Sequence, residues 1–303
     1  MITEKRIDLG NSLKLNVSYS IENENKPAIL LIHFSGGTLQ MWNGVIPLLQ
    51  KQYRIIAPDL RGHGKSDRPL TGYHIDDFAN DMYRLLHKLG IDKCHIVGSS
   101  LGAEVGLSIA ATHPEMVLSL VCEGAIYNEF GEYGLFNGSE VVIKEEKGKL
   151  RHQLKERKLT RYPTKADFIK DFKVPLIKQG LWNEHFKIFL ESCAEELTDG
   201  SFEHFYKNHG RNEYIQKYWD ISFEEYYKRV RCPVLILPSE DEWINSKIRR
   251  SLHYFVSLLD EYEVHIVEGS IHAYVWMQQP NKAIKAVKDF LDRYQTQVIY
   301  LPH

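Results

Sequence analysis

The sequence predicts an α/β fold in which a mostly parallel central sheet is flanked by helices and carries a helical cap insertion. Two observations carry this prediction. Short apolar runs alternate with stretches of helical period through residues 1–124 and again through 230–303, an order typical of a parallel sheet covered on both faces. Residues 125–229 show helical periods but no convincing strand. We therefore expect an α/β core of 1–124 and 230–303 with a helical cap of 125–229.

The elements of the core follow from the period of their apolar residues. Residues 7–9 and 13–19 alternate in polarity around Gly10-Asn11-Ser12, which predicts an antiparallel strand pair joined by a turn. The mixed-charge stretch 140–158 predicts a solvated helix face rather than a binding site. Short apolar runs predict buried strands at 28–32, 53–57, 94–97, 117–122, 233–237 and 262–267. Helical periods predict helices at 39–50, 75–89, 101–112, 246–258 and 281–294.

The charge pattern and missing motifs exclude several classes of partner. The chain has 38 Lys and Arg against 40 Asp and Glu, mixed along its length, so we expect no basic field that would attract nucleic acid or an anionic membrane. Without an apolar leader or a membrane-spanning run, a cytoplasmic protein is expected. No HExxH motif accompanies the fourteen histidines, so neither a metal nor another cofactor is expected. The expected partner is a small-molecule substrate, and the expected assembly is a monomer or homodimer.

The segment Gly98-Ser99-Ser100-Leu101-Gly102 follows a predicted strand and opens a predicted helix. A sharp turn from strand to helix strains the backbone of its central residue, and glycines two positions away on each side relieve the crowding. The Ser100 hydroxyl is then exposed beside the unpaired N–H groups of a helix start, where negative charge can develop. The pattern predicts Ser100 as a nucleophile, against the alternative of a serine that only caps a helix.

A glycine-rich segment, His33-Phe34-Ser35-Gly36-Gly37-Thr38, follows the predicted strand 28–32. Its glycines permit a loop whose backbone N–H groups turn inward. The amides of Ser35 and Leu101 are the predicted oxyanion hole, in which a single donor is typically worth about two to three decades in rate. An ordinary connecting loop is the alternative.

Four motifs in this order resemble the α/β-hydrolase family over residues 7–291. They are 33–42, 58–67, the turn around Ser100, and Gly269-Ser270-Ile271-His272. The resemblance implies that family's fold, a capped serine hydrolase, and catalytic groups in the order Ser, acid, His. A serine hydroxyl needs a base within hydrogen-bond reach, and the family places its histidine in such a loop, which implies His272. His33 and His63, which lie within the other motifs, are expected to brace loops rather than exchange protons.

The third catalytic group should be a carboxylate that orients the imidazole and stabilises its cationic form. After the predicted strand 233–237 the chain continues with Pro238-Ser239-Glu240-Asp241-Glu242-Trp243. The family's G-x-x-D pattern aligns Ser239 with its glycine and Glu242 with its acid, so Glu242 is the first candidate. Asp241 is the second, because a one-residue shift exchanges the two. Glu123, just after the predicted strand 117–122, is the third, because some family members carry the acid there.

The expected activity is hydrolysis of a small apolar or aromatic carboxylic ester through an acyl-enzyme on Ser100. C–C bond hydrolysis of a β-diketone or dienoate substrate is one alternative, and a non-catalytic ligand-binding receptor of this fold is another. Dehalogenase and epoxide hydrolase relatives use an Asp nucleophile, so Ser100 disfavours their chemistry. Aromatic residues of the insertion either line an apolar pocket or bury the cap against the core. The candidates for substrate contact are Phe34, Tyr127, Trp182, Trp219 and Tyr274.

Overall fold

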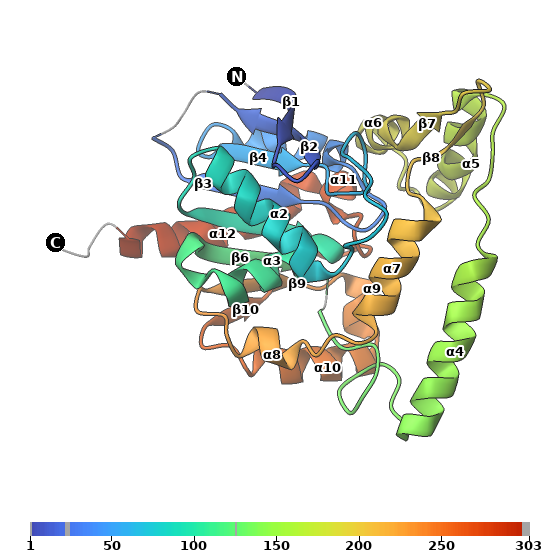
Figure 1. Cartoon of the computed structure of the whole chain (residues 1–303). Coiled ribbons are helices and arrows are strands. Elements are labelled where there is room, and N and C mark those ends of the chain that lie inside the picture. The colour runs from blue at the N-terminus through green and yellow to red at the C-terminus, as the bar shows by residue number, and fades with distance from the viewer. Residues whose placement is uncertain (1, 22–24, 125, 299–303) are drawn as a thin grey trace.

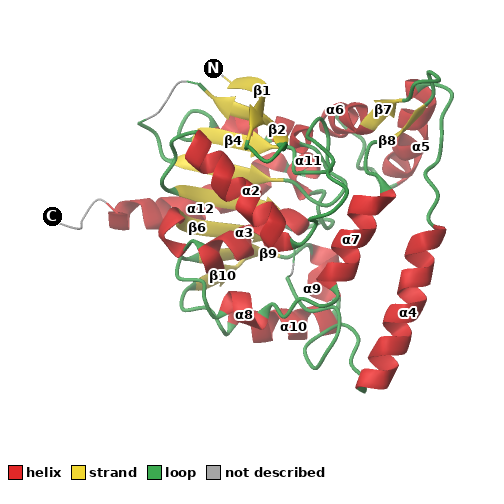
Figure 2. Cartoon of the chain, in the orientation of Figure 1, coloured by secondary structure: helices red, strands yellow, loops and turns green. Residues whose placement is uncertain are grey.

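The computed structural model describes residues 2–21, 25–124 and 126–298 (Figure 1). Within these residues, an eight-stranded sheet forms the centre of the molecule (Figure 2). Its strands, in spatial order, are β1 (Ile2–Asp8), β2 (Lys14–Ser20), β4 (Arg54–Pro58), β3 (Ala28–Ile32), β5 (Cys94–Ser99), β6 (Val117–Glu123), β9 (Val234–Leu237) and β10 (Tyr262–Val264). β2 pairs antiparallel with both β1 and β4, and the other neighbours are parallel. The predicted α/β class is confirmed.

The side chains of β3 alternate between the two faces of the sheet. Leu30 and Ile32 pack into the core on one face, whereas Ile29 and Leu31 pack into the core on the other. All five residues of the strand are buried. A strand covered on both faces needs an apolar side chain at every position, which is why its sequence shows a continuous run instead of alternating polarity.

Helices cover both faces of this sheet. The amphipathic α2 shows why they pack there, because Phe78, Met82 and Leu85 share one face and are buried against the sheet. The first face carries α2 (Ile75–Lys88), α3 (Leu101–Thr112), α8 (Glu224–Tyr227) and α10 (Ser246–Val256). The second face carries the 3-10 helix η1 (Leu39–Gly44), α1 (Ile46–Leu49), α11 (Val275–Gln278) and α12 (Pro280–Val298). The short helices η2 (Pro114–Met116) and α9 (Glu240–Ile244) lie in connections.

Most of the segment between β6 and β9, from α4 to α7, stands to one side of the sheet, to the right in Figure 1. Its elements are α4 (Glu140–Glu156), α5 (Lys165–Lys178), α6 (Glu184–Cys193), β7 (Ala194–Glu196), β8 (Phe202–His204), α7 (Asn208–Tyr218) and α8. The expectation of no strand here was wrong, because β7 and β8 form an antiparallel pair. These strands have three residues each and carry charged side chains, so no apolar run indicates them. α8 packs with the core helices, although the sequence assigned it to the cap.

Two core elements are shorter than predicted. The predicted helix 39–50 is divided into η1 and α1, and Pro47 lies in the first turn of α1. Proline has no amide hydrogen to donate, so it fits a first turn but interrupts a continuous helix. The predicted strand 262–267 ends at Val264. By contrast, the predicted helix 101–112 has the bounds of α3, which begins directly after Ser100.

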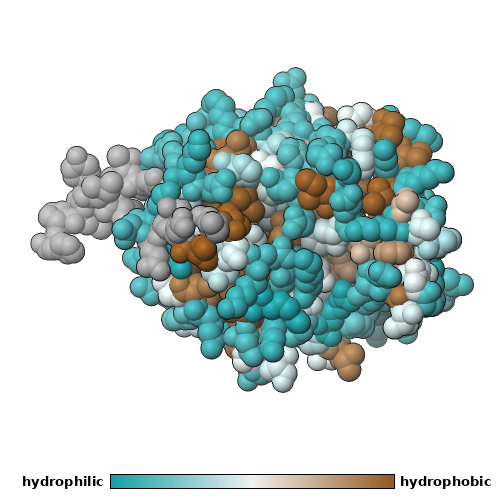
Figure 3. All heavy atoms as spheres, turned by 90° about the horizontal axis from the view of Figure 1, so that it is seen from above, coloured by the Kyte–Doolittle hydropathy of each residue, from teal (hydrophilic) through white to brown (hydrophobic). Residues whose placement is uncertain are grey.

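The outer surface is polar over most of the face seen in Figure 3, where hydrophobic side chains form small separate groups. Scattered exposed apolar side chains of this kind are normal on a folded protein. Among the described residues, no helix combines the length and the apolar character that crossing a membrane requires.

Candidate active site

Ser100 occupies the sharp turn between β5 and α3. Its backbone has φ 51° and ψ −117°, a conformation that a residue with a Cβ rarely adopts. A Cβ on Gly98 would lie 2.2 Å from the carbonyl oxygen of Gly102, and one on Gly102 would lie 2.1 Å from that of Ile32. Only glycine fits at these two positions, so the G-x-S-x-G spacing is a steric requirement of the turn.

His272 lies opposite Ser100, in the loop between β10 and α11. Its Nε2 is 3.1 Å from the Ser100 Oγ, which is hydrogen-bond distance between residues far apart in the sequence. The next residue, Ala273, has a positive φ of 63°, and its N–H donates to the Glu123 Oε1 at 2.8 Å. The backbone of this loop is therefore held by a core strand, which fixes the position of the imidazole.

Two carboxylates approach the other nitrogen of the imidazole. The His272 Nδ1 is 3.2 Å from the Glu242 Oε1 and 3.8 Å from the Glu123 Oε1. With the imidazole protonated, the shorter of these contacts is an ion pair with Glu242. The other oxygen of Glu242 accepts bonds of 2.9 Å from the N–H and the hydroxyl of Ser239. Glu242 is thus the nearer and well-oriented acid, and Asp241 lines the cavity beside it.

The charge around His272 favours its protonated form. Burial lowers the pKa of His272, but Glu242, Glu123 and Asp241 raise it, and the net pKa is about 9. Burial raises the pKa of Glu123, which is 1% exposed. An imidazole beside buried carboxylates binds a proton strongly, as a general base must when it takes the proton of a serine hydroxyl.

The glycine-rich loop after β3 is braced by two buried histidines. The N–H of Gly36 donates to the His63 Nε2, and the N–H of Leu60 donates to the His33 Nε2, each at 3.0 Å. Burial lowers the pKa of His33 to about 4 and holds the pKa of His63 well below its usual range, so both rings accept as neutral imidazoles. This geometry agrees with the bracing role expected from the sequence. Ser35 lines a cavity together with Ser100.

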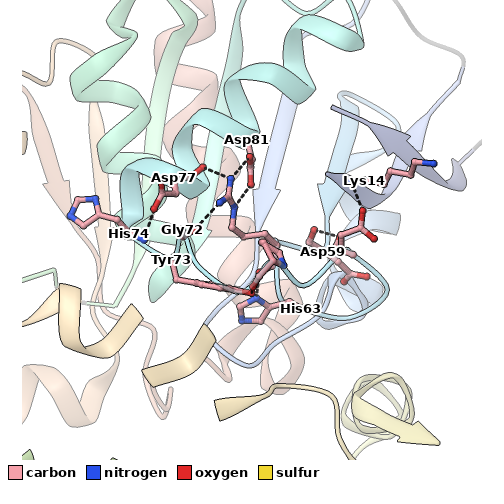
Figure 4. Close-up of polar contacts among 12 residues, drawn as sticks. Lys14, Asp59, His63, Gly72, Tyr73, His74, Asp77 and Asp81 are labelled. Carbon is pink, nitrogen blue, oxygen red and sulfur yellow. Dashed lines mark hydrogen bonds and ion pairs between the residues drawn. The ribbon is translucent and has the colours of Figure 1, made fainter. Parts of the chain in front are cut away.

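The loop 59–67, part of the second of the four sequence motifs, carries His63 (Figure 4). Arg61 and Asp81 form a paired contact, Nε to Oδ2 and Nη2 to Oδ1, both at 2.6 Å. The Asp59 Oδ1 accepts the N–H of Leu39 at 2.7 Å, which joins this loop to the end of the glycine-rich loop. Charged and backbone contacts therefore join the two loops.

Two cavities meet at Ser100. The acid-side cavity, about 750 Å³, contains His272 and Glu242, and the oxyanion-side cavity, about 570 Å³, contains Ser35. Of the predicted substrate contacts, Tyr127 and Trp219 line the acid-side cavity, and Phe34 and Tyr274 line the oxyanion-side cavity. Trp182 lines neither cavity. Its ring instead makes a cation–π contact with the ammonium group of Lys173, which lies 4.8 Å from the ring centre.

Several residues that line the acid-side cavity were not predicted from the sequence. Glu104 lies in the acid-side cavity, and both its oxygens accept from the Tyr214 hydroxyl, at 3.1 and 3.0 Å. Its spacing of four from Ser100 on a helix was a usable signal. The predicted solvated helix 140–158 corresponds to α4, of which no residue is buried, but one of its faces also contributes Leu150 and Leu154 to the same cavity. No sequence pattern indicates which cap residues turn inward.

No metal centre accompanies these groups in the part of the chain that the structure describes. There, no three His, Cys, Asp or Glu side chains form a group that could hold a metal ion. The arrangement of hydroxyl, imidazole and carboxylate can activate an oxygen nucleophile by proton transfer alone.

Comparison with known proteins gives the same architecture. A family model described as alpha/beta hydrolase fold matches residues 27–158. An uncharacterised protein of Mycobacterium bovis is 45% identical over 102 residues, 33% of this chain and 30% of that protein. The 2-hydroxy-6-oxo-6-(2'-aminophenyl)hexa-2,4-dienoic acid hydrolase of Metapseudomonas resinovorans is 26% identical over 273 residues, 88% of this chain and 84% of that enzyme.

Among solved structures, E-2-(acetamidomethylene)succinate hydrolase superposes with a TM-score of 0.76 at 22% identity, covering 96% of this chain and 100% of that one. The first curated relatives are matched over less than a third of their own length. The likeness of fold extends over nearly the whole chain. Residues 27–158 thus match the alpha/beta hydrolase family model, and the chain as a whole has the α/β-hydrolase fold.

Proposed function

We propose that this chain is a serine hydrolase that cleaves a small carboxylic ester through an acyl-enzyme on Ser100. The observation that carries the proposal is the 3.1 Å contact between the Ser100 Oγ and the His272 Nε2 at the strained turn. A carboxylate 3.2 Å behind the imidazole supports it. Nucleophile, base and orienting acid in one chain of contacts are what acyl transfer to serine needs.

In the first half of the reaction, the Ser100 Oγ attacks the carbonyl carbon while the His272 Nε2 takes the hydroxyl proton. The carbonyl oxygen becomes an oxyanion, which the N–H groups of Ser35 and Leu101 would stabilise. The bond to the leaving alkoxide then breaks, and the alkoxide takes the proton from Nε2. The ester has become an alcohol and an acyl group on Ser100.

In the second half, a water molecule attacks the acyl carbon while the His272 Nε2 takes one of its protons. The bond to Oγ breaks, and Nε2 returns the proton to Ser100, which releases the carboxylic acid. Throughout, Glu242 stabilises the imidazolium. Its two bonds from Ser239 support this role, because they hold the carboxylate while the charge on the ring changes.

The lining of the cavities supports an apolar or aromatic substrate. Phe34, Phe189 and Tyr274 line the oxyanion-side cavity beside Ser100, and aromatic walls of this kind bind flat apolar groups. A second candidate activity, C–C bond hydrolysis of a dienoate, is supported by the relative named as a dienoic acid hydrolase, which aligns over 84% of its length. Both reactions use the same serine.

Labelling with a fluorophosphonate probe, read by mass spectrometry, tests the nucleophile. We expect the label on Ser100 in the wild type and no label in Ser100→Ala. Ser108→Ala is the matched control, since Ser108 lies on the same helix and its hydroxyl binds Asp76. That variant should label and turn over aryl esters like the wild type.

Label on another residue, or ester turnover that survives Ser100→Ala, would refute the proposal. Turnover of neither aryl esters nor a dienoate by a protein that still binds them would favour a ligand-binding receptor instead. Faster turnover of the dienoate than of aryl esters would select C–C bond hydrolysis.

A further inference from the structure

Two guanidinium groups from different cap elements converge above the nucleophile. Arg157 directly follows α4, and Arg211 lies in α7. Both line the acid-side and the oxyanion-side cavities. The residues that the two cavities share are Ser100, Arg157, Arg211, Tyr214 and Ile215. The two arginines therefore stand where the cavities join, at the reacting hydroxyl.

Neither arginine has a carboxylate partner among the described residues. Other arginines do, such as Arg61 with Asp81 and Arg293 with Glu263. Arg157 donates to the side-chain oxygen of Asn208, and Arg211 makes a long contact of 3.4 Å with that of Asn212. Both arginines are only partly exposed. Their charges thus face the cavities without neutralisation.

The two positive charges disfavour each other. Burial lowers the pKa of Arg157, and the nearby charge of Arg211 lowers it further. Two partly desolvated like charges repel each other. An anion between them would remove the repulsion and accept hydrogen bonds from both planar groups, for which the guanidinium fork is well shaped.

The two cavities differ in the sign of their charged residues. The acid-side cavity is lined by Glu104, Glu123, Glu129, Asp241 and Glu242. The described lining of the oxyanion-side cavity contains the cations Arg157, Lys158 and Arg211 but no Asp or Glu. Arg157 and Arg211 also line the acid-side cavity, but there they lie among these carboxyl groups, so an anionic group is placed more favourably in the oxyanion-side cavity.

We propose that Arg157 and Arg211 form a subsite for a substrate carboxylate in the oxyanion-side cavity, so that the natural substrate is an apolar or aromatic carbonyl compound bearing a second, free carboxylate. This inference rests on the proposed function of Ser100. It adds a charge requirement to the apolar pocket, and it makes the two arginines specificity determinants rather than surface residues.

Matched substrates test the charge requirement. The first pair is the 4-nitrophenyl hemi-ester of glutarate and its primary amide, which differ in charge but hardly in shape. The second pair places the group on the leaving side, as the acetate esters of 3-hydroxybenzoate and 3-hydroxybenzamide. We expect kcat/KM to favour the acid over the amide in at least one pair by roughly 10- to 100-fold, the usual worth of charged hydrogen bonds.

The variants Arg157→Gln and Arg211→Gln should each remove most of this preference while turnover of the neutral amide ester is retained, and Arg211→Lys should restore part of it. Arg161→Gln is the control, because Arg161 is an exposed cap residue paired with Asp199. Equal kcat/KM for acid and amide in both pairs would overturn the subsite. So would a preference that survives both glutamine variants.

Binding separates a failed subsite from a failed nucleophile. Calorimetry on Ser100→Ala, which cannot turn over ester, compares glutarate with glutaramide. We expect glutarate to bind more tightly, and we expect Arg211→Gln in that background to abolish the difference. Arginine-dependent binding of glutarate without any fluorophosphonate label on Ser100 would retain the subsite and reject the serine mechanism. Label on Ser100 with equal binding of acid and amide would do the reverse.

Discussion

Glu123 and Glu242 approach the same nitrogen of His272 from two neighbouring strands of the sheet. Glu123 is the last residue of β6, and Glu242 lies in α9, just after β9. Their Oε1 atoms are 3.8 and 3.2 Å from the His272 Nδ1. Glu123 also accepts the hydroxyl of Ser99 and the N–H of Ala273. From these distances we propose that Glu242 orients the imidazole, whereas the contacts of Glu123 hold the backbone of the His272 loop and the Ser99 side chain.

Replacement of the acids should separate these roles. We expect Glu242→Gln to lower kcat by two to four decades, roughly the loss seen when a triad acid is made neutral. Glu123→Gln should lower it by about one decade, because Glu242 still contacts the ring. Asp241→Asn should have little effect. Steady-state kinetics on a 4-nitrophenyl ester measures all three. A larger loss in Asp241→Asn than in Glu242→Gln would reassign the acid.

The pH profile of kcat/KM should show an acidic limb, rising with pH, that is set by the pKa of His272. With a pKa of about 9, about one molecule in a hundred has a neutral imidazole at pH 7. Only the neutral ring can take the Ser100 proton, so kcat/KM should rise about tenfold per pH unit and level off near pH 9.

Removing one of the negative charges that raise the pKa of His272 should move this limb of the pH profile. Glu123→Gln is expected to shift it to lower pH, since Glu123 is one of the carboxylates that raise the pKa of His272. Asp289→Asn, an exposed site on α12, is the control and should leave the limb in place. A profile that is flat from pH 6 to 9 in the wild type would contradict the assignment of His272 as the base.

The site residues that the sequence could identify are those fixed by local geometry. Ser100 was predictable because a strand-to-helix turn requires Gly98 and Gly102, for which the Cβ clashes give the reason. The turn of the glycine-rich loop 33–38 was predictable because Gly36 has a positive φ of 83°, which favours glycine. Local backbone geometry of this kind depends on residues close together in the sequence, so a short motif is enough to predict it.

The cap could not be predicted in the same way. Trp182 and Trp219 look alike in sequence, yet Trp219 lines a cavity and Trp182 packs under Lys173. Arg157 lies in a highly charged stretch of the sequence, and its neighbour in space, Arg211, is 54 positions away. Their convergence depends on how α4 and α7 pack over the sheet, and no local period encodes that packing.

One methyl group added at the turn around Ser100 should lower both stability and activity severely. Gly102→Ala would bring a Cβ within 2.1 Å of the Ile32 carbonyl oxygen, so backbone must move. We expect a loss of at least about 2 kcal/mol in the free energy of unfolding, as overpacking in a rigid core causes, and loss of ester turnover. Urea denaturation followed by circular dichroism measures the first.

Gly148→Ala is the matched control for that substitution. Gly148 lies on the exposed side of α4, and a Cβ there would meet nothing within 4 Å. The change should stabilise the protein by about 0.5 to 1 kcal/mol, because alanine is the better helix former. A Gly102→Ala protein as stable and active as the wild type would show that the turn is not as tight as described.

Glu104 should make the stability of the protein depend on pH. Burial raises its pKa to about 7, although the Tyr214 hydrogen bond and the charge of His272 lower it. A carboxyl whose pKa is higher in the folded state favours folding below its unfolded pKa, about 4.5. That contribution is lost as pH rises through about 7. Ionisation of Glu104 should therefore cost roughly 2 to 3 kcal/mol of stability at pH 8.

The variant Glu104→Gln isolates this effect, because the amide cannot ionise and its oxygen can still accept from Tyr214. We expect its free energy of unfolding to match that of the wild type at pH 5 and to exceed it at pH 8. Urea denaturation at both pH values measures the difference, with Glu145→Gln on the exposed face of α4 as the control. Equal stabilities of Glu104→Gln and wild type at pH 8 would mean that Glu104 is ionised there without cost. In that case water, or a cation that enters the cavity, must solvate the carboxylate beside the nucleophile.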